Sequence, residues 1–334
     1  MPLRGFMPTQ NLTYRKAIYS ALDKVLSESE KTVFLGEDIT EYGGAFGVSA
    51  DLHTRHPSRV IATPISEGGF MGVAVGMAMT GYRVVVEMMF MDFMTLAFDQ
   101  IVNHAVNVHY MYGGQLTCPV VIRTPAGGYR GYGPSHSKAM ENMLFGVPGL
   151  KIMAPSTVQD AYGCLLTAVA DNNPVLFVEH KLLYSLEEAV DLAEIQPVPF
   201  GKARIVRQGS DVTVVSHSYG AHLAQQAVME LEDEGIDAEL IDLRSLKPLD
   251  IETIVESVTK TGSLVCVEEG NVTGGIGSEI TAIVAERCLE YLDGRIIRVG
   301  RGDTPIPASL ASEGLILPDK DTIKAAIRKA LRRL

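Results

Sequence analysis

The chain has 334 residues, of which 46% are hydrophobic, and a formal net charge of −11. This acidic balance argues against nucleic-acid binding and against binding to anionic membranes, because both need a basic surface. The length suggests two domains with sizeable cores, and the glycine-rich, charge-free run at 68–82 is too short to span a bilayer.

The cysteines and the N-terminus point to a reducing compartment. Cys118, Cys164, Cys266 and Cys288 lie far apart and form no CxxC pair, so neither a disulfide framework nor a zinc site is indicated. The first residues lack a charged and then apolar leader. We expect a cytoplasmic protein, or one located in the matrix after processing.

Short β-branched runs alternate with helical patterns along the first half of the chain. Strands are predicted at 33–37, 59–65, 83–89, 119–125, 151–156 and 174–180. Such alternation favours a parallel sheet with helices on both faces. Ligands of these sheets bind beyond the carboxyl ends of the strands, so that edge is where functional side chains are expected.

Residues 182–209 lose this rhythm, and it then resumes. The segment carries a charge run and two prolines, which indicates a linker. Further strands are predicted at 212–218, 238–243, 264–270 and 295–300. The chain is therefore predicted to have α/β domains at 1–185 and 210–334, joined by a linker at 186–209.

Glu67 is the only charged residue between Arg59 and Arg83. The helix predicted after it is apolar or small on every side, so we expect it to be enclosed all round and Glu67 to be at least half-buried. An acid at a helix start gains roughly 0.3 to 1 kcal/mol from the dipole, whereas burying a carboxylate costs several kcal/mol. A functional role is favoured, although a structural cap stays open.

The glycines of this helix indicate a neighbouring subunit. Gly68, Gly72 and Gly76 recur at four-residue spacing, and small residues at that spacing let another helix pack closely. Glu67 is therefore expected beside a subunit interface.

His136 ends the glycine-rich stretch AGGYRGYGPSH at 126–136, and such loops let backbone approach a ligand closely. We predict a functional role for it. His104 and His109 are interpreted as surface or interface residues, and GGIG at 274–277 as a tight turn, because it fails the dinucleotide pattern. Glu87 lies in a strand, and alternation alone leaves open whether it faces a cleft or a helix.

The pattern from Glu67 to Gly76, E-x4-G-apolar-x-x-G, resembles the pyrimidine-side signature of thiamine-diphosphate enzymes. GEDITEYGGAFGV (36–48), FMDFMTLAFDQI (90–101), DNNPVLFVEHKLLY (171–184) and VEEGNVTGGIGSEI (267–280) extend the resemblance over nearly the whole chain. Together they resemble the beta subunit of the decarboxylating component of 2-oxo acid dehydrogenase complexes, in the transketolase-like superfamily. This resemblance implies a pyrimidine-binding domain followed by a transketolase C-terminal-type domain.

The resemblance also implies roles for single residues. Glu67 matches the glutamate that hydrogen-bonds the cofactor's aminopyrimidine and promotes deprotonation of the thiazolium carbon. Phe93 matches the aromatic residue that stacks on the pyrimidine, and Ile65 matches a backbone contact to it. His136 matches a histidine that assists acyl transfer to a lipoyl group.

Cofactors and partners follow from the same resemblance. Thiamine diphosphate is implied, shared with an alpha subunit in an α2β2 tetramer, together with a lipoyl-bearing acyltransferase partner. Mg²⁺ would be held mainly by the alpha subunit, because the superfamily's GDG motif is absent here. The family's structural potassium ion would map to Val120, Ala168, Val169, Asp171 and Asn173.

One departure keeps alternatives open. Many family members read A-Q-H-S-Q at the histidine, whereas this chain reads Pro134-Ser135-His136-Ser137-Lys138, which is similar to the corresponding loop of transketolases. The alternatives are an acetoin dehydrogenase subunit and a subunit of a split transketolase-like carboligase.

Overall fold

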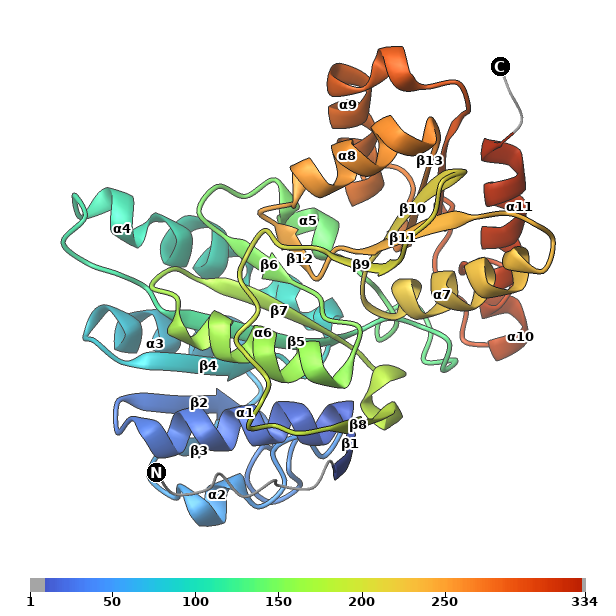
Figure 1. The fold of residues 1–334 in the computed structure, drawn as a ribbon. Helices are drawn as coiled ribbons and strands as arrows, with labels where there is room; N and C mark the ends of the chain where they lie inside the picture. The colour runs from blue at the N-terminus through green and yellow to red at the C-terminus, as the bar shows by residue number, and fades with distance from the viewer. Residues whose placement is uncertain (1–9, 332–334) are drawn as a thin grey trace, which may run out of the picture.

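The computed structural model describes residues 10–331, which form two β-sheets with helices on both faces and a small two-stranded sheet (Figure 1). Residues 1–9 and 332–334 of the predicted domains lie outside the described residues. The predicted α/β class is confirmed.

The first sheet has the strand order β12-β6-β7-β5-β4-β2-β3. Its parallel strands are β2 (Thr32–Gly36), β3 (Val60–Ala62), β4 (Arg83–Glu87), β5 (Val120–Ala126), β6 (Lys151–Met153) and β7 (Val175–His180). These six strands are the ones predicted from the sequence. They are apolar because helices cover both faces of the sheet. In β2, Val33 and Leu35 pack into one helical layer and Phe34 into the other.

Two helical layers enclose this sheet. The layer that contacts Phe34 contains α1 (Tyr14–Glu28) and α6 (Val158–Ala170), which begin at the capping side chains of Thr13 and Thr157. The opposite layer contains α3 (Glu67–Met79), η1 (Met91–Ala97), η2 (Gln100–His104), η3 (Ala105–Asn107), α4 (Val108–Met111) and α5 (Glu141–Phe145). Short elements at the loops are α2 (Leu52–Arg55) and η4 (Leu183–Ser185).

The second sheet has the order β14-β13-β10-β11-β9. Its strands are β9 (Arg204–Arg207), β10 (Val212–Ser216), β11 (Ala238–Asp242), β13 (Leu264–Asn271) and β14 (Ile296–Arg301). On one face lie α7 (Ser218–Glu232) and α11 (Lys320–Ala330), and on the other α8 (Ile251–Thr261) and α9 (Ile276–Arg287). The elements η5 (Leu289–Tyr291) and α10 (Leu310–Glu313) complete this half.

The two halves share strands and core. β12 (Ser245–Lys247) leaves the second half and pairs antiparallel with β6 of the first sheet. One apolar cluster continues from the α3 layer through Leu144 and Leu246 to Ile254 of α8. The second half is therefore packed directly against the first, close to the ends of its strands (Figure 1).

Four strands were not predicted. β1 (Gln10–Thr13) pairs antiparallel with β8 (Glu187–Val190), β9 lies antiparallel at the edge of the second sheet, and β12 at the edge of the first. β8 and β9 fall inside the segment predicted as a linker, so part of that segment forms strands that the sequence did not predict. Edge strands have one open side and tolerate charge, so their sequences lack an apolar run.

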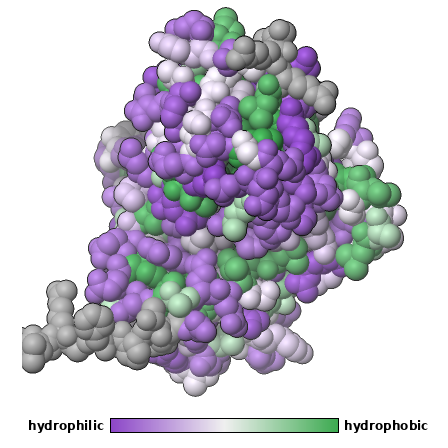
Figure 2. Space-filling model, turned by 45° about the vertical axis from the view of Figure 1, so that its right-hand side comes forward, coloured by the Kyte–Doolittle hydropathy of each residue, from purple (hydrophilic) through white to green (hydrophobic). Residues whose placement is uncertain are grey.

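The surface is mixed. Figure 2 shows a largely hydrophilic face on which apolar patches are set apart from one another. None of the helices within residues 10–331 has the length and apolar character needed to cross a bilayer.

Candidate active site

Glu67 is the first residue of α3, just beyond the carboxyl end of β3, where Pro64 follows the strand. Its side chain is 6% exposed, which confirms the expected burial. The preceding Ser66 makes no side-chain cap. The carboxylate therefore lies at a helix start that has no hydroxyl cap, in a place largely removed from water.

A second acid lies beside it. Glu37, after β2, is 4% exposed, and within the described residues its Oε1 atom has no hydrogen-bond partner. Burial, reinforced by the nearby Glu67 charge, raises the pKa of Glu37 to about 7. Two like charges at one buried site resist ionising together. In the sequence analysis Glu37 appears only within the segment 36–48 that carries the family resemblance, without a role of its own.

Glu37 should make the stability of the fold depend on pH. Its pKa of about 7 in the folded chain exceeds the value of about 4.3 for an unfolded glutamate, so between these values the folded state binds more protons and loses stability as pH rises. We expect Glu37→Gln to reduce the fall in urea midpoint between pH 5 and pH 8. Glu30→Gln, at a 91% exposed side chain, is the control. Equal slopes for wild type and Glu37→Gln would contradict this assignment.

The prediction that α3 is enclosed all round is wrong for the chain alone. Phe70, Met71 and Ala74 face the core, but Val73 is 56% exposed and a Cβ added at Gly76 would meet nothing. Ile65 at 80% and Leu96 at 63% extend this uncovered apolar strip. The prediction treated an all-apolar helix as enclosed by its own chain, although the four-residue spacing of its glycines indicated a neighbouring subunit.

Phe93 and His136 come from distant segments and meet. Phe93 lies in η1, and the His136 ring centroid lies 5.2 Å from that of Phe93 and 4.8 Å from that of Phe90, both edge-to-face. η1 packs against α3 so closely that a Cβ at Gly68 would lie 3.1 Å from the Leu96 carbonyl oxygen. Glu67, Phe93 and His136 thus lie on contiguous elements.

Two lysines fix the polar side of this aromatic cluster. Lys181, 2% exposed, donates a hydrogen bond to the His136 carbonyl oxygen, and burial lowers its pKa to about 8. Lys138 pairs with Asp92 at 3.0 Å. Lys181 has no signature in the sequence, because it follows β7 far from His136, and only the parallel pairing of β5 with β7 brings the two together.

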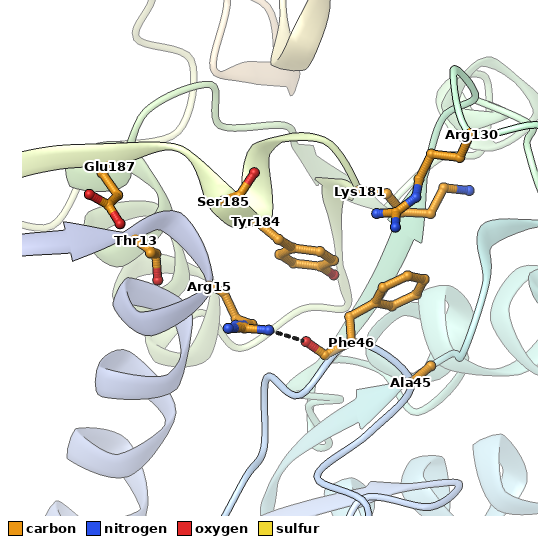
Figure 3. Close-up of a pocket in the computed structure, with 9 residues that line it drawn as sticks. All are labelled: Thr13, Arg15, Ala45, Phe46, Arg130, Lys181, Tyr184, Ser185 and Glu187. Atoms are coloured by element: carbon orange, nitrogen blue, oxygen red, sulfur yellow. Dashed lines mark hydrogen bonds between the residues drawn. The ribbon is translucent and has the colours of Figure 1, made fainter. Parts of the chain in front are cut away.

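A cavity of about 420 Å³ opens beside this cluster. Figure 3 shows its lining, from which Arg15, Arg130 and Lys181 contribute positive charge. The other lining residues are Thr13, Ala45, Phe46, Tyr184, Ser185 and Glu187. Neither Glu67 nor Phe93 lines it. Phe46 joins it to the site, since its ring centroid lies 5.5 Å from that of Phe90.

Glu87 belongs to the scaffold under this cavity. Arg123, 1% exposed, donates to Glu87 at 2.8 Å and to both carboxylate oxygens of Glu179, and Glu179 also accepts from Tyr184. A Cβ at Gly44 would lie 2.4 Å from Glu87 Oε1, so the turn before Phe46 rests on this carboxylate. Strand alternation left open whether Glu87 faces a cleft or a helix. The structure places its side chain in a buried ion pair with Arg123.

The residues mapped to a potassium site lie together at one end of the first sheet. Val120 begins β5, and Ala168 and Val169 end α6. Arg83 donates to the carbonyl oxygens of Val169 at 2.8 Å and Asp171 at 2.7 Å. Two of the expected cation ligands therefore already contact a guanidinium.

The carboxylate of Asp171 is also occupied. It pairs with Lys151 and accepts hydrogen bonds from the backbone and side-chain nitrogens of Asn173. These cationic and amide contacts lower the pKa of Asp171 against the opposing effect of burial. The cluster is polar and well satisfied without an added ion.

Comparisons with known proteins agree with this geometry. Residues 10–187 match the family model described as the transketolase pyrimidine binding domain, and residues 201–323 match that of the transketolase C-terminal domain. The chain is 43% identical over 320 residues to the pyruvate dehydrogenase E1 component subunit beta of Rickettsia felis, covering 95% of this chain and 98% of that protein.

Two further proteins are informative. The acetoin:2,6-dichlorophenolindophenol oxidoreductase subunit beta of Cupriavidus necator is 40% identical, covering 97% of this chain and 98% of its own. A solved split gene transketolase, described as an inactive beta4 tetramer, is 28% identical with a TM-score of 0.79, covering 96% and 99% of the two chains. The chain therefore belongs to the transketolase-like family, among the beta subunits of thiamine-diphosphate-dependent 2-oxo acid dehydrogenases.

Proposed function

We propose that the chain supplies the half of a thiamine-diphosphate site that contains the acidic residue Glu67. The enzyme would be a 2-oxo acid dehydrogenase, which decarboxylates a 2-oxo acid and passes the acyl group to a lipoyl domain. The observation that carries this proposal is the buried Glu67 on α3, packed beside the element that brings Phe93 against His136. Relatives named as pyruvate dehydrogenase E1 beta subunits support the reaction class.

The residues present fit the aminopyrimidine end of the cofactor. Glu67 and Glu37 form a buried acidic pair in which one Glu37 oxygen lacks a partner among the described residues, so a polar ligand atom could be satisfied there. Ile65 is exposed and Phe93 is half-buried, which leaves apolar surface for a planar ring. The bound cofactor would supply the nucleophilic carbon and the electron sink. Glu67 would hold and exchange the proton at the pyrimidine ring nitrogen.

The site would be completed by an alpha subunit. The sequence has no GDG motif for the diphosphate and its Mg²⁺, and the uncovered strip of Ile65, Val73 and Leu96 lies next to Glu67. The solved split gene transketolase, described as an inactive beta4 tetramer, supports the proposal that the active site is divided between two kinds of subunit. We infer an α2β2 tetramer with this strip at the subunit interface.

We also propose a division into a pyrimidine-binding domain at 1–185, a connecting segment at 186–209 and a transketolase C-terminal-like domain at 210–334. The connecting segment carries β8 back to β1 and β9 into the second sheet. The family matches end at 187 and begin again at 201, which supports this division.

Any potassium ion would be structural. Val120, Ala168, Val169, Asp171 and Asn173 would contribute oxygens, and the carbonyls of Val169 and Asp171 would share their lone pairs with Arg83. Because Arg83 already brings positive charge to these oxygens, no step of the reaction is assigned to the ion.

A second candidate is an acetoin dehydrogenase. The observation that favours it is the 40% identity to the acetoin-oxidising beta subunit over nearly the whole chain. A split transketolase has less support at 28% identity, although the sequence Pro134-Ser135-His136 resembles that group.

His136→Ala should separate the two half-reactions. Decarboxylation depends on Glu67 and the cofactor, whereas transfer to a lipoyl sulfur needs a proton donor at the mouth, where His136 lies. In the reconstituted α2β2 complex, we expect lipoyl-domain acylation to fall roughly a hundredfold or more, while release of carbon dioxide to an artificial electron acceptor falls much less.

Both rates are measured on one cofactor-saturated preparation, with His53→Ala in the exposed helix α2 as control. Equal losses in the two assays would contradict the role of His136 in acyl transfer. Ligation of an aldehyde acceptor by wild type, with no lipoyl acylation, would favour the carboligase.

A further inference from the structure

The loop that carries His136 is held by the second half of the chain. The Gly128 N–H donates to Glu269 Oε1 at 2.6 Å, and the Gly131 N–H donates to Glu313 Oε2 at 2.7 Å. Glu269 lies in β13 and Glu313 ends α10. Two backbone groups of the first domain are therefore anchored by carboxylates that belong to the second.

Both carboxylates are buried and closely fitted. Glu269 is 9% exposed and Glu313 is 0% exposed. A Cβ added at Gly128 would lie 2.6 Å from Glu313 Oε1, so the loop backbone is pressed against this acid. Buried backbone N–H groups need a hydrogen-bond partner, so these two carboxylates can hold the backbone of the glycine-rich loop in place.

His180 orients Glu269. The Leu182 N–H donates to His180 Nδ1 at 3.1 Å, which leaves the Nε2–H to donate to Glu269 Oε2 at 2.7 Å. Gly127 has a φ of +90°, and a Cβ there would lie 1.9 Å from His180 Nε2. The end of β7, the loop and β13 thus meet at the Glu269 carboxylate, and both of its oxygens accept hydrogen bonds.

Further contacts fix the rest of the loop. The Tyr129 hydroxyl donates to the Pro318 carbonyl oxygen at 2.7 Å, and a Cβ at Gly131 would lie 3.0 Å from the Ala308 carbonyl oxygen. At the far end Lys181 contacts the His136 carbonyl. The His136 backbone is therefore placed by the second half on one side and by Lys181 on the other.

We propose that Glu269 and Glu313 are positioning residues that set the reach of His136 at the active-site mouth. The second domain would thus act in the acyl-transfer step. The inference rests on the proposed function only for what His136 does; the anchoring of the loop stands on its own contacts.

The first test is independent of activity. In hydrogen–deuterium exchange on the full chain, we expect Glu313→Leu to increase exchange in the peptide covering 127–136, with little change in the strands of either sheet. Glu313→Gln, which keeps an oxygen for the Gly131 N–H, should restore most of the protection. The control is Glu268→Gln, at a neighbouring buried acid that accepts only from Ile276 and Gly277 of its own half. Unchanged exchange at 127–136 in Glu313→Leu would overturn the anchoring.

The second test links the anchors to His136. A misplacement of about 1 Å can lower a rate roughly a hundredfold, so we expect Glu313→Leu and Glu269→Leu to reduce lipoyl acylation by about tenfold to a hundredfold while carbon dioxide release falls less than threefold. In a His136→Ala background the same substitutions should add almost nothing, because the group they position is gone. Glu313→Gln should largely recover the acylation rate.

The outcomes separate the two hypotheses. Additive losses in the double variants, or equal losses in both half-reactions, would overturn positioning and leave only a structural contact between domains. A wild-type complex that never acylates a lipoyl domain would instead contradict the proposed function, and the exchange measurement would still decide whether the loop is anchored.

Discussion

Replacing Glu67 with glutamine is expected to lower turnover of the reconstituted complex by roughly a hundredfold to ten-thousandfold, the usual range for loss of an acid–base group. Glutamine keeps the size and shape of the side chain at the start of α3, where Glu67 is 6% exposed, but cannot exchange a proton. The measurement is steady-state release of carbon dioxide with saturating 2-oxo acid and cofactor.

The control is an acid at another helix start. Glu252, in the first turn of α8, is 68% exposed and pairs with Arg287, so Glu252→Gln removes a similar helix-terminal charge without touching the site. It should leave turnover unchanged. If Glu67→Gln turned over as fast as Glu252→Gln, Glu67 would be a structural residue of the helix start.

The second large effect is the loss of all detectable turnover when the chain is purified alone. Glu67, Phe93 and His136 lie on contiguous elements, but no GDG motif is present to hold the diphosphate and Mg²⁺. We expect weak cofactor binding by calorimetry, and turnover only after an alpha subunit bearing that motif is added.

A substitution at the proposed interface offers a matched check. Val73→Glu places a charge on the exposed strip of α3 and should prevent assembly while leaving the fold intact, since Val73 is 56% exposed. Met229→Glu, at a 59% exposed position on α7, is the control.

In the calorimetry on the chain alone, magnesium-dependent cofactor binding in the micromolar range would contradict the prediction that this chain contains only half of the cofactor site.

The parts of the fold that the sequence predicted are those with a local signal. The central strands β4, β5, β7 and β10 are apolar runs because both of their faces are covered, and they were all located. β1, β8, β9 and β12 are short edge strands with polar or charged residues, and pairing with distant segments decides their conformation.

The residues of the candidate site were likewise predicted only where the sequence carries a signal for them. Burial of Glu67 followed from its isolation in an apolar segment. The family resemblance gave Phe93 and His136 separate roles, and their contact emerged only from the structure. Lys181, Glu269 and Glu313 were missed, because their contacts are made between segments far apart in the sequence, where no local pattern indicates them. The enclosure of α3 was overestimated, since an apolar helix looks the same in sequence whether its own chain or a partner covers it.

The most direct test of the account is the rate at which the thiazolium carbon proton of bound thiamine diphosphate exchanges with deuterium, followed by quenched-flow NMR on the α2β2 complex. This rate reports cofactor activation without substrate, product release or a lipoyl domain. The account predicts rapid exchange in wild type and in Glu252→Gln, and exchange at close to the rate of the free cofactor in Glu67→Gln. Wild-type exchange in Glu67→Gln, with cofactor bound at full occupancy, would contradict the central claim that this carboxylate activates the cofactor.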